Sequence, residues 1–540
     1  MYISYSTING HLYAQLAESE RDGNTIRKKY SANLGRVLDK EKGIYRNRER
    51  GVFTFDLATG TYGTVSPDFT EPPKRKKGKY IHVNGKKRSR LCIEFGNSFF
   101  LDEFLKNTGF YPVIDAVGYG NPDTLHTIIF YYLLSQQANS HAADWYELNY
   151  AKNLFPNAAV SSQRISETLA EIGTEESKRA FFAAYYAFVR NRSRVREKVC
   201  RAGAADLTAG SDGIDCGSDG ILIDSTGLPN SAHMPITAIS NHNGTVSEEI
   251  RLIYVVQQNT GFPLFFSYIA GNVVDASTIK HVVSHLKKNG IETGFAILDA
   301  GYYNGINADV LCAAKISFLT RVHSNNKVFT KALKEHRRSL ECRENFVTYN
   351  GRFYYIKRTE CMIGQKCDRR AYAYLGLDLT MREQQKRHLC EKMSDGHLSD
   401  GDIYDSMEDY GLFMLVATRP VATEKILPLY YTRNRIEEVF RVDKGKGKLL
   451  PLRTATEETF CGHIMVTFIA TVILMLLQEK LANTSFTSSA MFEELRHQQG
   501  IVYDDAIVPS VAVKKMNDIY KLFKVKCPDE IPLKEHLEDR

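Results

Sequence analysis

The chain has 540 residues, of which 43% are hydrophobic and 25% are charged. These values are ordinary for a soluble globular protein, and the length is enough for a large core and predicts two to four domains. The 70 Lys and Arg residues exceed the 63 Asp and Glu residues, giving a net charge of +7, which by itself is a weak indication of a polyanionic partner.

Two short segments concentrate the positive charge. Between Lys74 and Arg90, nine of the seventeen residues are Lys or Arg and none is acidic. Between Arg190 and Arg201, six of twelve residues are basic. Either segment alone is equally typical of a solvated loop or linker. Two segments of this density together favour a polyanionic partner.

The cellular setting follows from the cysteines and from one apolar run. The ten cysteines are scattered, and the opening residues do not resemble a signal peptide, so we expect free thiols in a reducing cytosol. The apolar run from Cys461 to Leu477 is short for a membrane span and contains His463. We therefore predict a buried helix and no membrane partner.

The first 97 residues are predicted to form a β-rich basic region. Asn9-Gly10 and Asp22-Gly23 are hairpin turn signals and predict a β-meander, which residues 33–35 interrupt. After the basic segment, residues 91–95 are predicted to form a further strand.

Residues 98–207 change to a helical pattern and form a predicted helical domain. Within this region, Ser161 or Ser162 is expected to cap the N-terminus of a short helix that ends at Gly173. Such a helix between two others could enter a DNA groove, or it could be an ordinary member of a helical bundle.

Residues 208–324 predict the first part of an α/β core. A Gly- and Asp-rich linker is followed by a strand, a two-stranded hairpin, a helix, a strand, a helix and a strand. The ranges of these elements are 221–223, 250–257 with 263–269, 275–289, 295–298, 304–314 and 316–322. Three antiparallel strands followed by parallel ones predict a mixed sheet with helices on its faces.

The remainder of the chain is predicted to interrupt and then complete this core. Residues 325–410 form a β-rich insertion, and a strand at the start of residues 411–480 rejoins the sheet. Residues 481–540 form a helical tail, with apolar patterns around Met491 and Met516.

The most informative segment is a predicted helix that begins near Leu429 and stops at Gly445. Four polar residues recur along this helix. Tyr430 is followed by Arg433, Glu437 and Lys444 at three, seven and fourteen residues further along the chain. At about 100° per residue, these side chains fall within a sector of about 60° on the helix. A line of phenol, guanidinium, carboxylate and ammonium groups suits a site for a metal ion and a phosphodiester. A solvated face with an ion pair between Arg433 and Glu437 would give the same pattern.

Three carboxylates are predicted to converge at one edge of the sheet. Asp224 follows the strand 221–223, Asp299 follows the strand 295–298, and Glu437 lies on the helix after the sheet. Packed together, these groups would repel one another unless a cation lay between them. Two divalent ions about 3.5–4 Å apart would relieve the repulsion and could catalyse an in-line displacement at phosphorus. Oxygen ligands favour Mg²⁺ or Mn²⁺.

These residues resemble those of the DDE transposases of bacterial insertion sequences, which have a ribonuclease-H-like core. One subgroup carries the signature Y-x2-R-x3-E-x6-K, and Tyr430, Arg433, Glu437 and Lys444 fit every spacing in it. Asp224 in ILIDST and Asp299 in FAILDAGYYN match the first two acids of the family. The long interval between Asp299 and Glu437 matches the β-rich insertion of the subgroup.

The resemblance implies a fold and a role for each of these residues. The expected fold is α/β: a ribonuclease-H-like mixed sheet with helices on both faces and a β-rich insertion, preceded by the β-meander and the helical DNA-binding region. Two Mg²⁺ or Mn²⁺ ions would be held by Asp224, Asp299 and Glu437. The phosphate backbone of the DNA would be gripped by Tyr430, Arg433 and Lys444, since guanidinium and ammonium groups suit phosphate.

The implied activity is that of a transposase acting on double-stranded DNA. It would bind the terminal inverted repeats of its own element as a homodimer, cleave the ends, and join their 3′-hydroxyls to target DNA in a prokaryotic cytoplasm, at the nucleoid. Two alternatives remain: a metal-dependent nuclease of the same fold, or a catalytically silent DNA-binding repressor. Some relatives stack a tryptophan of the insertion on a flipped base during hairpin formation, whereas the single tryptophan here, Trp145, lies far upstream.

Overall fold

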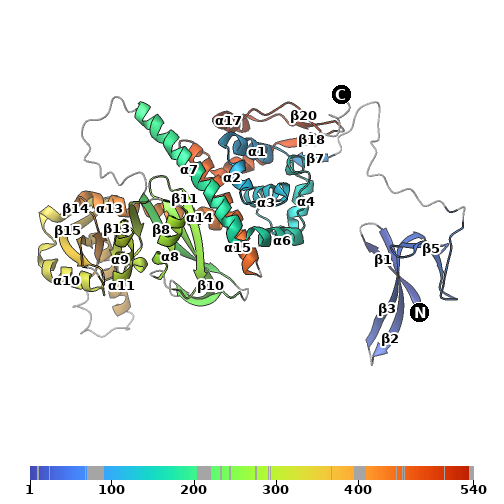
Figure 1. The fold of residues 1–540 in the computed structure, drawn as a ribbon, viewed down its shortest axis with the longest axis horizontal. Helices are drawn as coiled ribbons and strands as arrows, with labels where there is room; N and C mark the ends of the chain where they lie inside the picture. The colour runs from blue at the N-terminus through green and yellow to red at the C-terminus, as the bar shows by residue number, and fades with distance from the viewer. Residues whose placement is uncertain are drawn as a thin grey trace. The chain divides into compact units, whose positions relative to one another are not determined.

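The computed structural model divides the chain into two compact units, Met1–Arg88 and Ser89–Arg540 (Figure 1). The structure describes all residues except 9–10, 23–24, 67–68, 70–90, 204–219, 231–233, 243–244, 274–276, 290, 292, 367, 395–408, 446, 453, 455, 504 and 534–540. The basic segment 74–90 and the predicted linker therefore lie outside the described residues. The side chains of residues 193–201 in the second basic segment also lie outside them.

The first unit is the predicted β-meander. Its six strands follow one another in a single antiparallel sheet: β1 (Tyr2–Ile8), β2 (His11–Asp22), β3 (Thr25–Asp39), β4 (Ile44–Asn47), β5 (Gly51–Asp56) and β6 (Thr61–Gly63). The predicted break at residues 33–35 is wrong, because β3 continues through it with a shift of register against β2. Gly35 has a φ of +84°, and a Cβ there would lie 2.2 Å from the carbonyl oxygen of Arg46. The glycine thus permits a bulge rather than a turn.

A helical region opens the second unit, as predicted. After strand β7 (Leu91–Glu94), the helices are α1 (Gly96–Thr108), α2 (Tyr111–Asp115), α3 (Pro122–Leu134), η1 (Asn139–His141), α4 (Ala142–Glu147), α5 (Ala151–Leu154), α6 (Ser162–Ile172) and α7 (Glu175–Gly203). Ser161 caps α6 by accepting a hydrogen bond from the Arg164 N–H, and Gly173 follows its last turn. Both predicted ends of this helix are confirmed.

The centre of the second unit is a ten-stranded mixed sheet. Along the sheet the strand order is β11-β10-β8-β12-β13-β17-β16-β15-β14, with β9 paired to β10. Their bounds are β8 (Gly220–Pro229), β9 (Ala238–His242), β10 (Thr245–Gln257), β11 (Pro263–Ala270), β12 (Phe295–Leu298), β13 (Ser317–Val322), β14 (Phe346–Tyr349), β15 (Arg352–Ile363), β16 (Arg369–Asp378) and β17 (Leu412–Ala417). Strands β8, β12 and β13 are parallel to one another, whereas β10, β11 and β17 run antiparallel to their neighbours. The predicted mixed sheet is confirmed.

Helices connect these strands in the predicted order. They are α8 (Ile279–Lys288), η3 (Ala300–Tyr302), α9 (Gly305–Ala313), α10 (Lys327–His336) and α11 (Leu379–Ser394), together with the short turns η4 (Arg337–Ser339) and η5 (Arg343–Asn345). Strand β17 rejoins the sheet beside β13. The strands of the insertion extend this same sheet beyond β17, because β16 pairs with β17 in antiparallel register.

Helix α15 (Glu457–Leu481) is the apolar centre on which other helices pack, including α3, α6 and α14 (Asn434–Gly445) (Figure 1). By length and composition alone this helix could cross a membrane, yet 89% of its most apolar window is buried inside the protein. A Cβ at Gly462 would lie 1.8 Å from the carbonyl oxygen of Leu169 in α6. The glycine therefore allows the two helices to cross at very short range.

The end of the chain returns to the helical region. Helices α16 (Ser488–Arg496) and α17 (Lys514–Phe523) occupy the two predicted helical patterns. Between and after them, strands β18 (Gln499–Val502), β19 (Ala506–Pro509) and β20 (Ile531–Pro532) form a small antiparallel sheet with β7. These short strands were not predicted, because each owes its existence to pairing with a distant segment.

Candidate active site

Two aspartates lie side by side at the centre of the large sheet. The parallel register pairs Ile223 of β8 with Leu298 of β12, and the next residues are Asp224 and Asp299. Side chains at equivalent positions of neighbouring strands point to the same face of a sheet. Strand β12 ends at this point, as predicted. Strand β8 does not end at Asp224, because it continues to Pro229 by pairing with β10.

The helix predicted from Tyr430 to Gly445 is two helices in the structure. Helix α13 (Thr423–Tyr431) ends after Tyr430, and α14 begins at Asn434. Arg433 lies in the turn between them, where its backbone N–H bonds to the carbonyl three residues back rather than four. This tighter turn interrupts the regular rotation of about 100° per residue. The prediction that the four polar side chains share one face of a single helix depended on that rotation.

The turn nevertheless carries Arg433 to the two aspartates. Its Nη1 lies 3.2 Å from Asp224 Oδ2 and 3.2 Å from Asp299 Oδ1, while its Nη2 donates a 3.0 Å hydrogen bond to Glu437 Oε1. One guanidinium thus contacts all three carboxylates that the sequence predicts to converge. Burial alone would lower the pKa of Arg433, but Asp299 and Asp224 raise it, so the group stays cationic.

Exposure differs among the three acids. The Asp224 side chain is 14% exposed, that of Asp299 is 42% exposed and that of Glu437 is 55% exposed. Asp224 is also fixed locally, because its Oδ1 accepts a 2.8 Å hydrogen bond from the Ser225 N–H. The site therefore has one largely buried carboxylate, that of Asp224, and two that are more exposed to solvent.

Tyr430 and Lys444 flank this cluster. The phenol of Tyr430 donates a 3.5 Å hydrogen bond to Asp299 Oδ1, and burial followed by the charge of Asp299 raises its pKa, so the hydroxyl remains protonated. Lys444 Nζ donates to Thr226 Oγ1 at 2.6 Å and to the carbonyl oxygen of Gly227 at 3.0 Å. Lys444 therefore contacts β8 two to three residues beyond Asp224, and not the carboxylates themselves.

A buried aspartate that sequence reasoning missed fixes the end of α14. Asp443 accepts hydrogen bonds from the Tyr254 hydroxyl of β10 and, at 3.0 Å, from Thr471 Oγ1 of α15. Burial raises its pKa to about 6, although both hydrogen bonds oppose this. The only sequence signal was a carboxylate on the apolar side of the helix, next to Lys444.

The oxygen donors of this site fit a divalent cation. Asp224 and Asp299 contact Nη1 of Arg433, and Glu437 contacts Nη2, so all three carboxylates border the same guanidinium. Among the described residues, no three acidic, His or Cys side chains are arranged as ligands of a single metal ion, since the guanidinium of Arg433 lies between the carboxylates. Carboxylates of this kind suit Mg²⁺ or Mn²⁺.

Aromatic residues of the insertion are placed differently from Trp145. Trp145 belongs to α4, where its ring packs edge-on against Tyr131. In the insertion, Phe346 and Phe353 stack on each other at 5.8 Å and are 45% and 50% exposed. Beside the site, Tyr431 stacks on Tyr349 at 5.5 Å.

Comparison with known proteins finds a family model that matches part of this chain. The model of the transposase DDE domain matches residues 215–473, a range that contains all six predicted site residues. No curated protein matches the chain. Among solved structures, the piggyBac transposase in a synaptic complex with hairpin DNA is similar over 70% of this chain and 70% of that chain, with 10% identity and a TM-score of 0.39. That likeness is too distant for residues to be compared. The match covers less than half of the chain and shows a likeness to the transposase DDE domain over the part that holds the predicted site.

Proposed function

We propose that this protein is a DNA transposase with a ribonuclease-H-like core. It binds the terminal inverted repeats of its own element, cleaves the ends by phosphodiester hydrolysis, and joins the 3′-hydroxyls to target DNA. The observation that carries the proposal is the contact of one guanidinium, that of Arg433, with Asp224, Asp299 and Glu437. Three acids from distant parts of the chain share one cationic centre.

In this proposal the three carboxylates hold two Mg²⁺ ions, or Mn²⁺ ions. When bound, such ions activate a water or 3′-hydroxyl and stabilise the leaving oxygen. Asp224 is the innermost ligand, because it is the least exposed and its Oδ1 is already held by the Ser225 N–H. Asp299 and Glu437 face outward and complete the site from the side at which DNA arrives.

Tyr430, Arg433 and Lys444 orient the phosphate backbone of the transposon end. The fork of Arg433 can take a phosphate bidentately once other cations neutralise the acids, because a guanidinium remains charged at any ordinary pH. Tyr430 offers a protonated hydroxyl, and Lys444 a point charge anchored on Thr226 and Gly227. Pairing two transposon ends calls for a homodimer on DNA, in the cytoplasm of a prokaryote at the nucleoid.

The test compares two adjacent glutamates. Glu437→Gln removes a carboxylate that contacts Arg433, whereas Glu438→Gln removes one that pairs with Arg441 on the exposed side of α14. We expect Glu437→Gln to abolish cleavage of a terminal-repeat duplex while leaving binding within a few-fold, and Glu438→Gln to cleave within about two-fold of the natural protein. Cleavage by Glu437→Gln would show that this residue is not the third ligand.

Two further measurements separate the remaining alternatives. Pre-cut ends offered with a target plasmid give joined products if the protein is a transposase, and none if it is a nuclease of the same fold. End binding should also weaken steeply between about 50 and 200 mM salt, because basic residues displace counterions from the backbone. Binding that is unchanged across this range would remove the proposed role of the two basic segments.

A further inference from the structure

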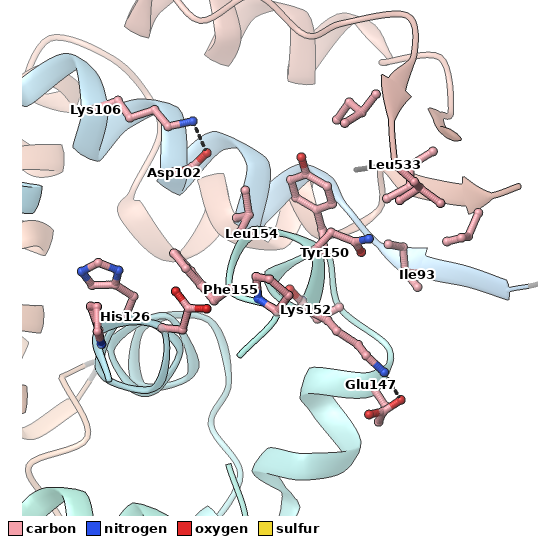
Figure 2. Close-up of a pocket in the computed structure, with 18 of the residues that line it drawn as sticks. Ile93, Asp102, Lys106, His126, Glu147, Tyr150, Lys152, Leu154, Phe155 and Leu533 are labelled. Atoms are coloured by element: carbon pink, nitrogen blue, oxygen red, sulfur yellow. Dashed lines mark hydrogen bonds and ion pairs between the residues drawn. The ribbon is translucent and has the colours of Figure 1, made fainter. Parts of the chain in front are cut away.

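One large cavity of the second unit has no unpaired lysine among the described residues that line it. It has a volume of about 1060 Å³ and lies between helices of the helical region and the small terminal sheet. Figure 2 shows that its lysines are already paired: Lys106 lies 2.6 Å from Asp102, and Lys152 pairs with Glu147. The cavity has ordinary internal charge compensation and calls for no charged ligand.

A second cavity, of about 370 Å³, differs in its lining. It lies where α3, η1 and α6 meet the start of α15 and the segment that follows α14. Hydroxyl and amide side chains dominate its walls, together with one lysine and one histidine: Gln136, Gln137, Asn139, Ser140, Ser162, Ser166, Lys448, Thr454, Thr459 and His463. No Asp or Glu lines it among the described residues.

Lys448 supplies an uncompensated positive charge to this cavity. Its Nζ donates a 3.0 Å hydrogen bond to the carbonyl oxygen of Gln137 and lies 3.7 Å from the ring centre of Tyr131. In the described part of the chain, no carboxylate forms an ion pair with it. Burial lowers its pKa to about 7, since nothing anionic offsets the loss of water. Binding of an anion would restore the full charge.

His463, the histidine that lines this cavity, is neutral, so it neither neutralises Lys448 nor attracts an anion itself. Burial lowers its pKa to about 4, so the ring is neutral. Its Nε2 lies 3.2 Å from the carbonyl oxygen of Leu449, which can only accept, so Nε2 carries the proton. Its Nδ1 then accepts a 3.1 Å hydrogen bond from the Tyr132 hydroxyl. Both ring nitrogens are thus engaged in holding the cavity wall.

Thr454 adds an unused donor. This residue is only 6% exposed, yet its Oγ1 has no hydrogen-bond partner among the residues that the structure describes. A buried hydroxyl without a partner costs free energy unless a ligand or water completes it. The first turn of α6 lies in the same wall through Ser162, and the N-terminal end of an eleven-residue helix adds positive potential.

We propose that the cavity lined by Lys448 and Thr454 binds a phosphate group. The cationic ammonium, the unused hydroxyl and the surrounding polar side chains provide donors and a positive charge in a space that lacks acids. The group can be free phosphate or a phosphate of the DNA backbone.

If it is a DNA phosphate, the inference rests on the proposed function. Arg433 precedes α14 and Lys448 follows it, and the twelve residues of α14 span about 18 Å. This length equals the rise of about five base pairs.

The first arm measures thermal unfolding of the full chain in inorganic phosphate against chloride at equal ionic strength. We expect about 20 mM phosphate to raise the melting midpoint by about 2 °C or more, and Lys448→Gln to lose this shift. Thr454→Val, which keeps the shape of the side chain, should reduce the shift by at least half. Lys480→Gln, an exposed lysine at the other end of α15, should retain it in full.

The second arm measures binding to a 30-base-pair duplex of arbitrary sequence over a series of salt concentrations. For a backbone phosphate, Lys448→Gln weakens binding about five- to ten-fold near 100 mM salt and reduces the salt slope by about one. An unchanged slope together with a phosphate-dependent melting shift assigns the cavity to free phosphate. If neither measurement responds to Lys448→Gln or to Thr454→Val, the proposal is overturned. Neither arm involves cleavage, so the result is independent of whether Glu437 is catalytic.

Discussion

The two ends of α14 carry cations in opposite surroundings. Just before the helix, Arg433 contacts three carboxylates. Just after it, Lys448 contacts a backbone carbonyl and an aromatic ring, and no carboxylate of the described chain. Arg433 is stabilised by carboxylates that a metal ion could also neutralise. Lys448 is buried although no carboxylate of the described chain neutralises its charge. The comparison shows that a basic side chain can neutralise neighbouring acids, or can itself remain without a neutralising anion.

The largest effect on stability is expected at Arg433, the cation that contacts carboxylates. Arg433→Gln leaves three carboxylates without their shared cation, so the metal-free protein should lose about 3 kcal/mol of stability. Added Mg²⁺ should then raise the melting midpoint more in the variant than in the natural protein. Thermal unfolding in EDTA and in Mg²⁺ measures both effects. Arg441→Gln, which removes only an exposed pair with Glu438, serves as the control. If Mg²⁺ raised the melting midpoints of the two variants equally, Arg433 would not be the cation that neutralises the three acids.

A smaller effect is expected at Asp443, between the two cations. Asp443→Asn leaves either Tyr254 or Thr471 without an acceptor and should cost about 1–3 kcal/mol. Because the pKa of Asp443 rises from its ordinary 3.8 to about 6, the native state binds more protons between these values. The stability that Asp443 contributes therefore falls as the pH rises from 4 to 6. Unfolding experiments at pH 5 and pH 8 should find the larger loss at pH 5.

The smallest effect, of opposite sign, is expected at the uncompensated end. Lys448→Met removes a charge that pairs with no carboxylate of the described residues, so in phosphate-free buffer the variant should be about 1 kcal/mol more stable at pH 7. The pKa of Lys448 falls to about 7 from an ordinary 10.5. Its penalty is complete below pH 7 and disappears as the pH rises to 10.5, so the gain should shrink at pH 9.5. A variant less stable at pH 7 would indicate a structural role for the ammonium.

Much of the fold could be predicted because local patterns agree with it. The buried strands, the caps of α6 and the apolar run of α15 each carry their own sequence signal. The break between α13 and α14 carries none, because the residues on both sides have helical spacing and tertiary contacts decide the turn. The pairing of β18 with β7 joins segments about 400 residues apart, and no local pattern encodes it.

The candidate site could be predicted in composition but not in arrangement. Spacing and order selected the three acids and Arg433, and the structure brings them together. What spacing could not predict is that Arg433 would lie among the acids. It also could not predict that Lys444 would bind β8 at Thr226 and Gly227. Both depend on the angle at which the helix meets the sheet, which only the packed core determines.

Strand β8 continues past Asp224 and offers Thr226 to Lys444 from the same backbone. Residues two apart along a strand share a face and are about 6.8 Å apart, so the strand acts as a fixed spacer between the acid and the lysine contact. Adding or removing one residue between them would turn one of the two groups to the opposite face. Exchange of side chains along this strand should therefore be tolerated far better than any change in its length.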